Sequence, residues 1–186
     1  MKKKKKNDNK ESKYAYKKKT AYKIFTKDQL KKAYSFCNEY KKFLDSSKTE
    51  REATDSIVKI VKKTGKKIIV NKGKCSAILI NGKKPVKNGV KIVISHVDSP
   101  RLDIKQNPLY EECNSNVALL ETHYYGGIKK YHWVVIPLAL HGVIFTKAGK
   151  KIDFTIGEKE SDPVFSVPDL LPHLSHEVQD KKSINK

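Results

Sequence analysis

The fold class depends on one stretch of the sequence, residues 90–101, which reads VKIVISHVDSPR. Its first six residues form a compact apolar run that suits a buried strand. His96 and Asp98 follow where that strand is expected to end, and ligands of open α/β sheets bind at the carboxyl ends of strands. Residues two apart in an extended chain point to the same side, so the two side chains should lie together.

The pair of His96 and Asp98 is a candidate metal site. A histidine binds a metal through one ring nitrogen, and a nearby carboxylate supports the ligand or the site. The spacing alone also fits an ordinary surface or capping pair, so both interpretations stay open at this point. Such a site does not select sharply among zinc, cobalt and manganese. Three other histidines lie in β-type runs, where they are expected to pack or to face solvent: His123, His132 and His141.

Upstream of this stretch the sequence predicts two helices and two strands. Apolar residues recur every three or four positions over residues 30–44, which predicts an amphipathic helix. Thr49 followed by Glu52 is a capping box that begins a second helix. Strands are expected at residues 67–70 and 75–80, on either side of an Asn-Lys-Gly turn. Two helices that lead into strands indicate an α/β protein.

Downstream of Pro100 the pattern changes to β-type runs separated by turn residues, with no long helix between them. This pattern predicts an antiparallel β layer over residues 102–105, 117–124, 133–145 and 151–156. A loop and one short helical turn are expected near His173, before a charged end.

Composition limits the function classes. The chain has 186 residues, with 40 Lys and Arg against 20 Asp and Glu, so its formal net charge is +20. Only two of the basic residues are arginine, the residue that base recognition and bidentate phosphate contacts favour. A compositional bias toward lysine is therefore the preferred explanation, and we do not expect nucleic acid as a partner. No apolar run is long enough to span a membrane, so no membrane partner is expected.

The ends and the cysteines indicate the compartment. The lysine-rich start, residues 1–22, reads as a solvated tail, and no apolar stretch follows it as in a secretion signal. The cysteines are odd in number and widely spaced, which predicts free thiols in a reducing compartment and a cytoplasmic protein: Cys37, Cys75 and Cys113.

An ordered series of motifs resembles the aspartyl aminopeptidase family, which includes the vacuolar aminopeptidase I type. The series covers roughly residues 20–180. The most specific parts are HVDSPR, YGG and PHL, which occur together and in order. The matching segments are NKGK (71–74), ISHVDSPRLDIK (94–105), PLY (108–110), THYYGG (122–127), LHG (140–142) and DLLPHL (169–174).

The resemblance implies a fold and an activity. Members are dinuclear zinc aminopeptidases that remove N-terminal residues, often acidic ones, from peptides, and they form dimer-based homo-oligomers. The implied fold class is α/β: the N-terminal part of a zinc-exopeptidase sandwich domain, followed by the start of an inserted β-rich dimerisation domain. The implied division is a basic tail at 1–22, the peptidase part at 23–100 and the incomplete dimerisation domain at 101–186.

The same resemblance implies roles for three residues. His96 would bind one of two Zn²⁺ ions, and Asp98 would orient this ligand and the site. His173 would reach the active site of the partner subunit and contact substrate there. The remaining ligands are absent from this chain, so we expect the 186 residues alone to be inactive. Trp133 is followed by Val-Val-Ile before Pro137, where many relatives have an Asp-Arg pair, so substrate preference stays open.

Two alternatives from other classes remain. A small basic nucleic-acid-binding protein would explain the charge and would bind with a steep dependence on salt. A non-catalytic interaction subunit would use the β-rich part to pair with an intact relative. Neither explains the ordered series of motifs.

Overall fold

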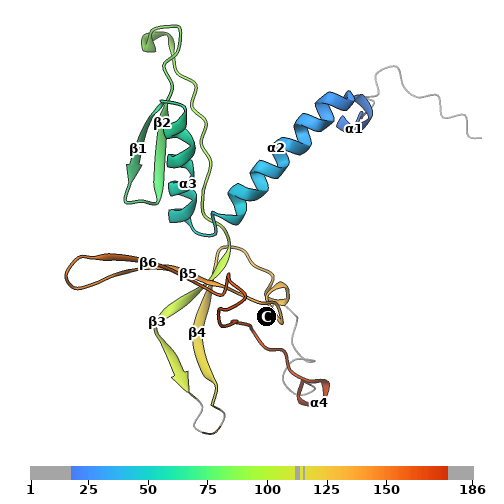
Figure 1. Cartoon of the computed structure of the whole chain (residues 1–186), viewed down its shortest axis with the longest axis vertical. Helices are drawn as coiled ribbons and strands as arrows, with labels where there is room; N and C mark the ends of the chain where they lie inside the picture. The colour runs from blue at the N-terminus through green and yellow to red at the C-terminus, as the bar shows by residue number, and fades with distance from the viewer. Residues whose placement is uncertain (1–17, 112–113, 115, 176–186) are drawn as a thin grey trace, which may run out of the picture. The chain divides into compact units, whose positions relative to one another are not determined.

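The computed structural model describes residues 18–111, 114 and 116–175, with helices and strands both present (Figure 1). The chain divides into two compact units, Met1–Lys42 and Phe43–Lys186. No described helix is long and apolar enough to cross a membrane. The division into residues 1–22, 23–100 and 101–186 stays a prediction, and most of the basic tail lies outside the described residues.

The first unit consists of a short helix and most of a long one. α1 spans Ala21–Ile24 and α2 spans Lys27–Asp45, which confirms the helix expected over residues 30–44. Apolar side chains of the two helices form a shallow pocket, lined by Tyr22, Phe25, Leu30, Tyr34 and Cys37 among others. No residue of α2 is buried, so within this unit the apolar stripe of the helix remains exposed to solvent.

α3 (Glu50–Lys63) begins as its sequence predicts. The Thr49 hydroxyl accepts from the Glu52 backbone N–H, and the Glu52 carboxylate accepts from the Thr49 backbone N–H at 2.9 Å. This capping box satisfies two donors that a helix start otherwise leaves free. Ala53, Thr54 and Val61 are buried, so one face of α3 is the best-packed surface of the second unit.

β1 (Lys67–Asn71) and β2 (Cys75–Leu79) form an antiparallel hairpin that contacts α3. The turn between them places Lys72 and Gly73 at φ of +51° and +66°, a region that glycine adopts without strain. Both strands and their turn were expected from sequence. Cys75 is a free, exposed thiol, as is Cys37, which confirms that expectation for these two; Cys113 lies outside the described residues.

Residues 90–95 do not form the buried strand that the sequence predicts. They pair with no other strand in the described part of the chain. Ile92, Val93 and Ile94 are among its most exposed apolar side chains, and Val93 is 96% exposed. A strand of this kind needs neighbours along both edges and layers on both faces. The described residues provide neither, so the prediction of burial is wrong for this chain by itself.

β3 (Arg101–Glu111) and β4 (Ala118–Tyr125) form the second hairpin. Their pairing starts with Arg101 opposite Tyr125 and is interrupted by an irregularity between Ile104 and Leu109. The register matters for the site described below, because it fixes the Tyr125 backbone beside the start of β3.

β5 (Leu140–Phe145) and β6 (Lys151–Ile156) form the third hairpin. A Cβ atom at Gly142 would lie 2.5 Å from the Phe154 ring, so any larger residue there would force the ring to shift. The run at 133–145 was expected to be one strand, but only its second half is. Val134 and Leu138 make isolated bridges to Val167 and Phe165 instead.

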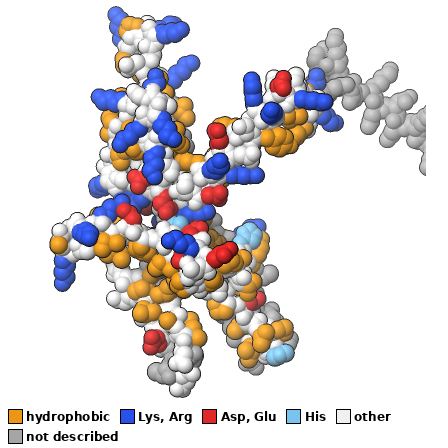
Figure 2. Space-filling view, in the orientation of Figure 1, with side chains coloured by type: hydrophobic (Ala, Val, Ile, Leu, Met, Phe, Trp, Pro, Cys, Tyr) orange, Lys and Arg blue, Asp and Glu red, His pale blue; other side chains and the backbone are white. Residues whose placement is uncertain are grey.

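The second half of the chain therefore has the β character that the sequence predicts, but as separate hairpins in the described residues. Hydrophobic side chains remain visible on their surfaces, as over β5 and β6 in Figure 2. α4 (Pro172–Ser175) is the short helical turn that was expected around His173.

Candidate functional site

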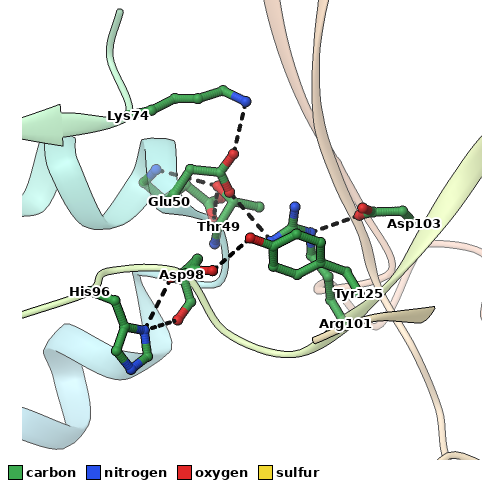
Figure 3. A network of polar contacts seen from close by, with 9 residues as sticks. Thr49, Glu50, Lys74, His96, Asp98, Arg101, Asp103 and Tyr125 are labelled. Carbon is green, nitrogen blue, oxygen red and sulfur yellow. Dashed lines mark hydrogen bonds and ion pairs between the residues drawn. The ribbon is translucent and has the colours of Figure 1, made fainter. Parts of the chain in front are cut away.

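His96 and Asp98 lie together, as their spacing predicts. The His96 Nδ1 atom is 3.1 Å from the Asp98 carboxylate Oδ1 and 2.9 Å from the Asp98 backbone oxygen. The His96 side chain is 83% exposed, and its other ring nitrogen points away from Asp98 (Figure 3). The ring is therefore held from one side and open on the other.

This geometry selects one tautomer of His96. A backbone carbonyl oxygen and an ionised carboxylate only accept hydrogen bonds, so the nitrogen that faces both of them carries the proton. Nδ1 of His96 is then an N–H donor to both Asp98 acceptors, and in the neutral ring Nε2 carries the lone pair. A metal binds a histidine through such a lone pair, so the exposed nitrogen of His96 is ready to act as a ligand.

The second oxygen of the Asp98 carboxylate is held by Tyr125. The Tyr125 hydroxyl donates to Asp98 Oδ2 at 2.7 Å. This bond is the main reason that the pKa of the Asp98 carboxyl lies below its ordinary value; the Asp98 backbone and His96 add to it. The same bond raises the pKa of the Tyr125 hydroxyl. Asp98 is thus a carboxylate with both oxygens engaged.

Arg101 connects this group to α3. Its guanidinium lies 4.1 Å from the centre of the Tyr125 ring, its Nε donates to Asp103 at 2.7 Å, and it lies 3.5 Å from a Glu50 oxygen. Lys74 pairs with the other Glu50 oxygen at 3.0 Å (Figure 3). Burial alone would raise the pKa of Glu50, but its backbone hydrogen bond and the two cations lower it. The network fixes the start of β3 against the start of α3.

The backbone behind Tyr125 is also constrained. Gly126 has a φ of +73°, which favours glycine, and it lies against Pro100. A Cβ atom at Gly126 would meet Pro100 at 3.5 Å, an ordinary contact. The glycine is therefore required by its backbone angle, and it brings the end of β4 beside the residues that follow Asp98.

A second polar cluster was not predicted. Both ring nitrogens of His141 lie within hydrogen-bond distance of a carboxylate: Nδ1 is 2.8 Å from Glu52, and Nε2 is 2.9 Å from Glu158. Its side chain is only 13% exposed. The expectation that His141 packs or faces solvent missed the two carboxylates, because Glu52 is 89 residues away in sequence. The cluster joins α3 to β5.

His173 lies on α4, and in the part of the chain that the structure describes no hydrogen bond or ion pair joins it to His96 or Asp98. Its expected role across a subunit interface stays a prediction, as do the metal role of His96 and the orienting role of Asp98.

Among the described side chains, His96 suits the role of one metal ligand. Within residues 18–111, 114 and 116–175, no three His, Cys, Asp or Glu side chains gather closely enough to hold a metal ion. His96 nevertheless has the features of a ligand: an exposed nitrogen, and a carboxylate that fixes the opposite nitrogen. The described chain supplies one oriented imidazole, and a complete site needs further ligands.

The described chain is a mixed helix and hairpin fold in which a carboxylate orients an exposed histidine. Residues 27–186 match the family described as Aminopeptidase I zinc metalloprotease (M18). The chain belongs to this M18 family, which confirms the family resemblance and the α/β fold class. The names of the relatives are M18 aminopeptidases, so the narrower aspartyl and vacuolar labels go beyond them.

Individual relatives agree. A probable M18 family aminopeptidase 1 from Clostridium acetobutylicum is 42% identical over 183 residues, covering 89% of this chain and 39% of the relative. A Thermotoga neapolitana protein of the same name is 46% identical, covering 77% of this chain and 34% of the relative. The crystal structure of an M18 aminopeptidase from Thermotoga maritima is similar with a TM-score of 0.80 and 38% identity, covering 91% of this chain and 39% of that one.

The chain spans about two-fifths of the length of these relatives. The similarity therefore places the described hairpins and the His96 segment within an M18 chain, while the activity of a whole M18 protein is a matter for proposal.

Proposed function

We propose that this chain is the N-terminal part of a zinc metalloaminopeptidase that removes N-terminal residues from peptides, including acidic ones. The M18 family match supports the reaction class. The observation that carries the assignment to residues is the contact between His96 Nδ1 and Asp98, which leaves the other imidazole nitrogen exposed.

In this proposal His96 binds zinc through Nε2, and Asp98 keeps the ring in the required tautomer and orientation. Zinc supplies a Lewis acid and lowers the pKa of a bound water to near neutrality. Two zinc ions for each active site fit the family resemblance. Their other ligands would be residues outside the described part of this chain. Cobalt or manganese would suit the same ligand types.

The proposal extends to partners and location. A dimer-based homo-oligomer would let His173 contact substrate in a neighbouring subunit, and the exposed position of His173 supports its availability. The exposed free thiols Cys37 and Cys75 suit a reducing, cytoplasmic location. Neither membrane nor nucleic acid is a proposed partner.

The test is fragment complementation. The chain is co-expressed with the remainder of the Clostridium acetobutylicum relative, downstream of the region that it matches. With Zn²⁺, the purified pair should release N-terminal amino acids from short peptides, whereas either part alone should not. His96→Asn should abolish the activity. A stable, zinc-loaded pair without peptidase activity, or activity that persists in His96→Asn, would contradict the proposal.

One observation favours a second candidate, a non-catalytic subunit that pairs with an intact M18 protein. The apolar segment at residues 90–95 is exposed, and an exposed sheet edge of the partner could accept it as an added strand. This candidate predicts co-purification with the whole relative and no gain in peptidase activity. Zinc-dependent turnover by the complementing pair would exclude it.

A further inference from the structure

We propose that Tyr125 is a positioning residue for His96: its hydroxyl fixes the Asp98 carboxylate, which in turn holds the His96 ring with Nδ1 toward the carboxylate and Nε2 available to a metal. The inference deepens the proposed function and rests on it for the identity of the metal. It assigns a role to the YGG motif, which the resemblance left without one.

The contacts form a chain of three side chains. Tyr125 donates to Asp98 Oδ2 at 2.7 Å, and Asp98 Oδ1 accepts from His96 Nδ1 at 3.1 Å. An aspartate carboxylate with one oxygen free can rotate about its side-chain bond. The histidine ring that it holds would then no longer have a fixed orientation. With both oxygens engaged, the carboxylate plane is fixed, and so is the acceptor that faces His96 (Figure 3).

Tyr125 is itself held in two ways, through its backbone and through its ring. Its backbone is paired opposite Arg101 at the start of the β3–β4 hairpin. Its ring lies 4.1 Å from the Arg101 guanidinium, a cation–π distance. Arg101 is in turn bound to Asp103 and faces Glu50. The Tyr125 hydroxyl is therefore held in a fixed position, as is required of a residue that supports a metal ligand.

A purely structural role for Tyr125 would predict something different. In that case the bond to Asp98 would only tie residues 96–100 to the end of β4, and the state of the His96 ring would not depend on it. The Asp98 backbone oxygen also accepts from His96 Nδ1 at 2.9 Å, so the carbonyl could hold the ring by itself. The two roles are separated by the tautomer of His96.

The experiment is nitrogen-15 NMR of the histidine rings in the 186-residue chain, recorded at about pH 8.5, where imidazoles carry one proton. His96→Asn assigns the signals. In the wild-type chain His96 should be the Nδ1–H tautomer. Tyr125→Phe keeps the ring and the strand pairing but removes the hydroxyl, and the Nε2–H tautomer should then appear. Asp98→Ala sets the scale for complete loss of the carboxylate.

Tyr124→Phe is the matched control. Tyr124 is the preceding residue of β4, so it points to the opposite face of the strand, and its substitution should leave the His96 signals unchanged. If Tyr125→Phe also leaves them unchanged, or if Asp98→Ala does so, the backbone carbonyl alone holds the ring and the inference is overturned.

A second readout uses the complementing pair. Loss of a partner that orients a metal ligand typically lowers metal affinity by about 10–100-fold. The Zn²⁺ concentration that half-activates the Tyr125→Phe pair should rise by at least about tenfold, with no change for Tyr124→Phe. If the wild-type pair is inactive with zinc, the proposed function fails, whereas the tautomer comparison still decides the role of Tyr125.

Discussion

Two neighbouring regions of the second unit behave in opposite ways. Residues 49–79, which form α3 and the β1–β2 hairpin, close on themselves and bury Ala53, Thr54 and Val61. Residues 90–100 also begin with an apolar run, but Val93 is 96% exposed and no strand pairs with this segment in the described residues. Both were expected to belong to the α/β peptidase part at residues 23–100.

The difference shows where each region finds its partners. α3, β1 and β2 are consecutive, so a helix and a hairpin satisfy one another over about thirty residues. A buried strand needs neighbours that come from distant parts of a chain. The candidate ligand His96 lies at the end of the incomplete region. Its orientation, however, comes from the complete β3–β4 hairpin, through Tyr125.

The largest effect should come from a charge placed in the exposed apolar segment at residues 90–95. Val93→Asp should change the free energy of unfolding of the chain alone by less than about 0.5 kcal/mol, since the side chain is exposed. In the complementing pair it should reduce peptidase activity at least about 100-fold, because an unpaired buried carboxylate costs several kcal/mol. Peptide turnover and urea unfolding measure the two quantities.

Val86→Asp is the control for this prediction, because Val86 is 77% exposed in the 3₁₀ turn η1 (Val86–Asn88), outside the apolar run. It should leave both quantities nearly unchanged. A loss of about 1 kcal/mol or more in the Val93→Asp chain alone would show that the two regions do not differ as described.

The next effect concerns the packed region. Val61 is 7% exposed on α3, and Val61→Ala removes two buried carbon groups and leaves a small cavity. The free energy of unfolding should fall by about 2 kcal/mol. Val93→Ala makes the same chemical change at an exposed site and should cost less than about 0.5 kcal/mol. Equal losses for the two variants in urea unfolding would remove the contrast between the regions.

Much of the local structure could be predicted because its determinants are close in sequence. The capping box joins Thr49 to Glu52, and the β1–β2 turn depends on three adjacent residues. The contact between His96 and Asp98 followed from their spacing in the same way. In each case the partners lie within a few residues of each other, so chain geometry alone brings them together.

The rest could not be predicted, because it depends on tertiary pairing. Tyr125 lies 27 residues from Asp98, and His141 lies 89 residues from Glu52. The register that places Tyr125 opposite Arg101 is set by how the β3–β4 hairpin closes, which the sequence pattern did not specify. The burial of residues 90–95 was predicted from composition, but burial requires a neighbour as well as an apolar side chain.

A smaller effect should come from the cap of α3. Thr49→Ala removes the acceptor for the Glu52 backbone N–H and should cost about 1 kcal/mol of unfolding free energy. Thr20→Ala is a matched control, since Thr20 precedes α1 as its cap residue but makes no side-chain cap bond. It should have little effect. A similar cost for both variants would mean that the loss reflects threonine removal rather than capping.

The smallest effect should be a pH dependence at Glu52. Burial alone would raise the pKa of Glu52, but the bonds from His141 and Thr49 outweigh it and lower the pKa below its ordinary value of 4.5. A carboxyl with a lowered folded-state pKa stabilises the fold above its unfolded pKa, and this contribution is lost as the pH falls through the folded-state pKa. Glu52→Gln should therefore flatten the stability profile from about pH 4.5 downward. Asp55→Asn, at an exposed position on α3, should leave the stability profile unchanged. If the acid side of the profile is also unchanged in Glu52→Gln, the contact between Glu52 and His141 adds no net stability to the packed region.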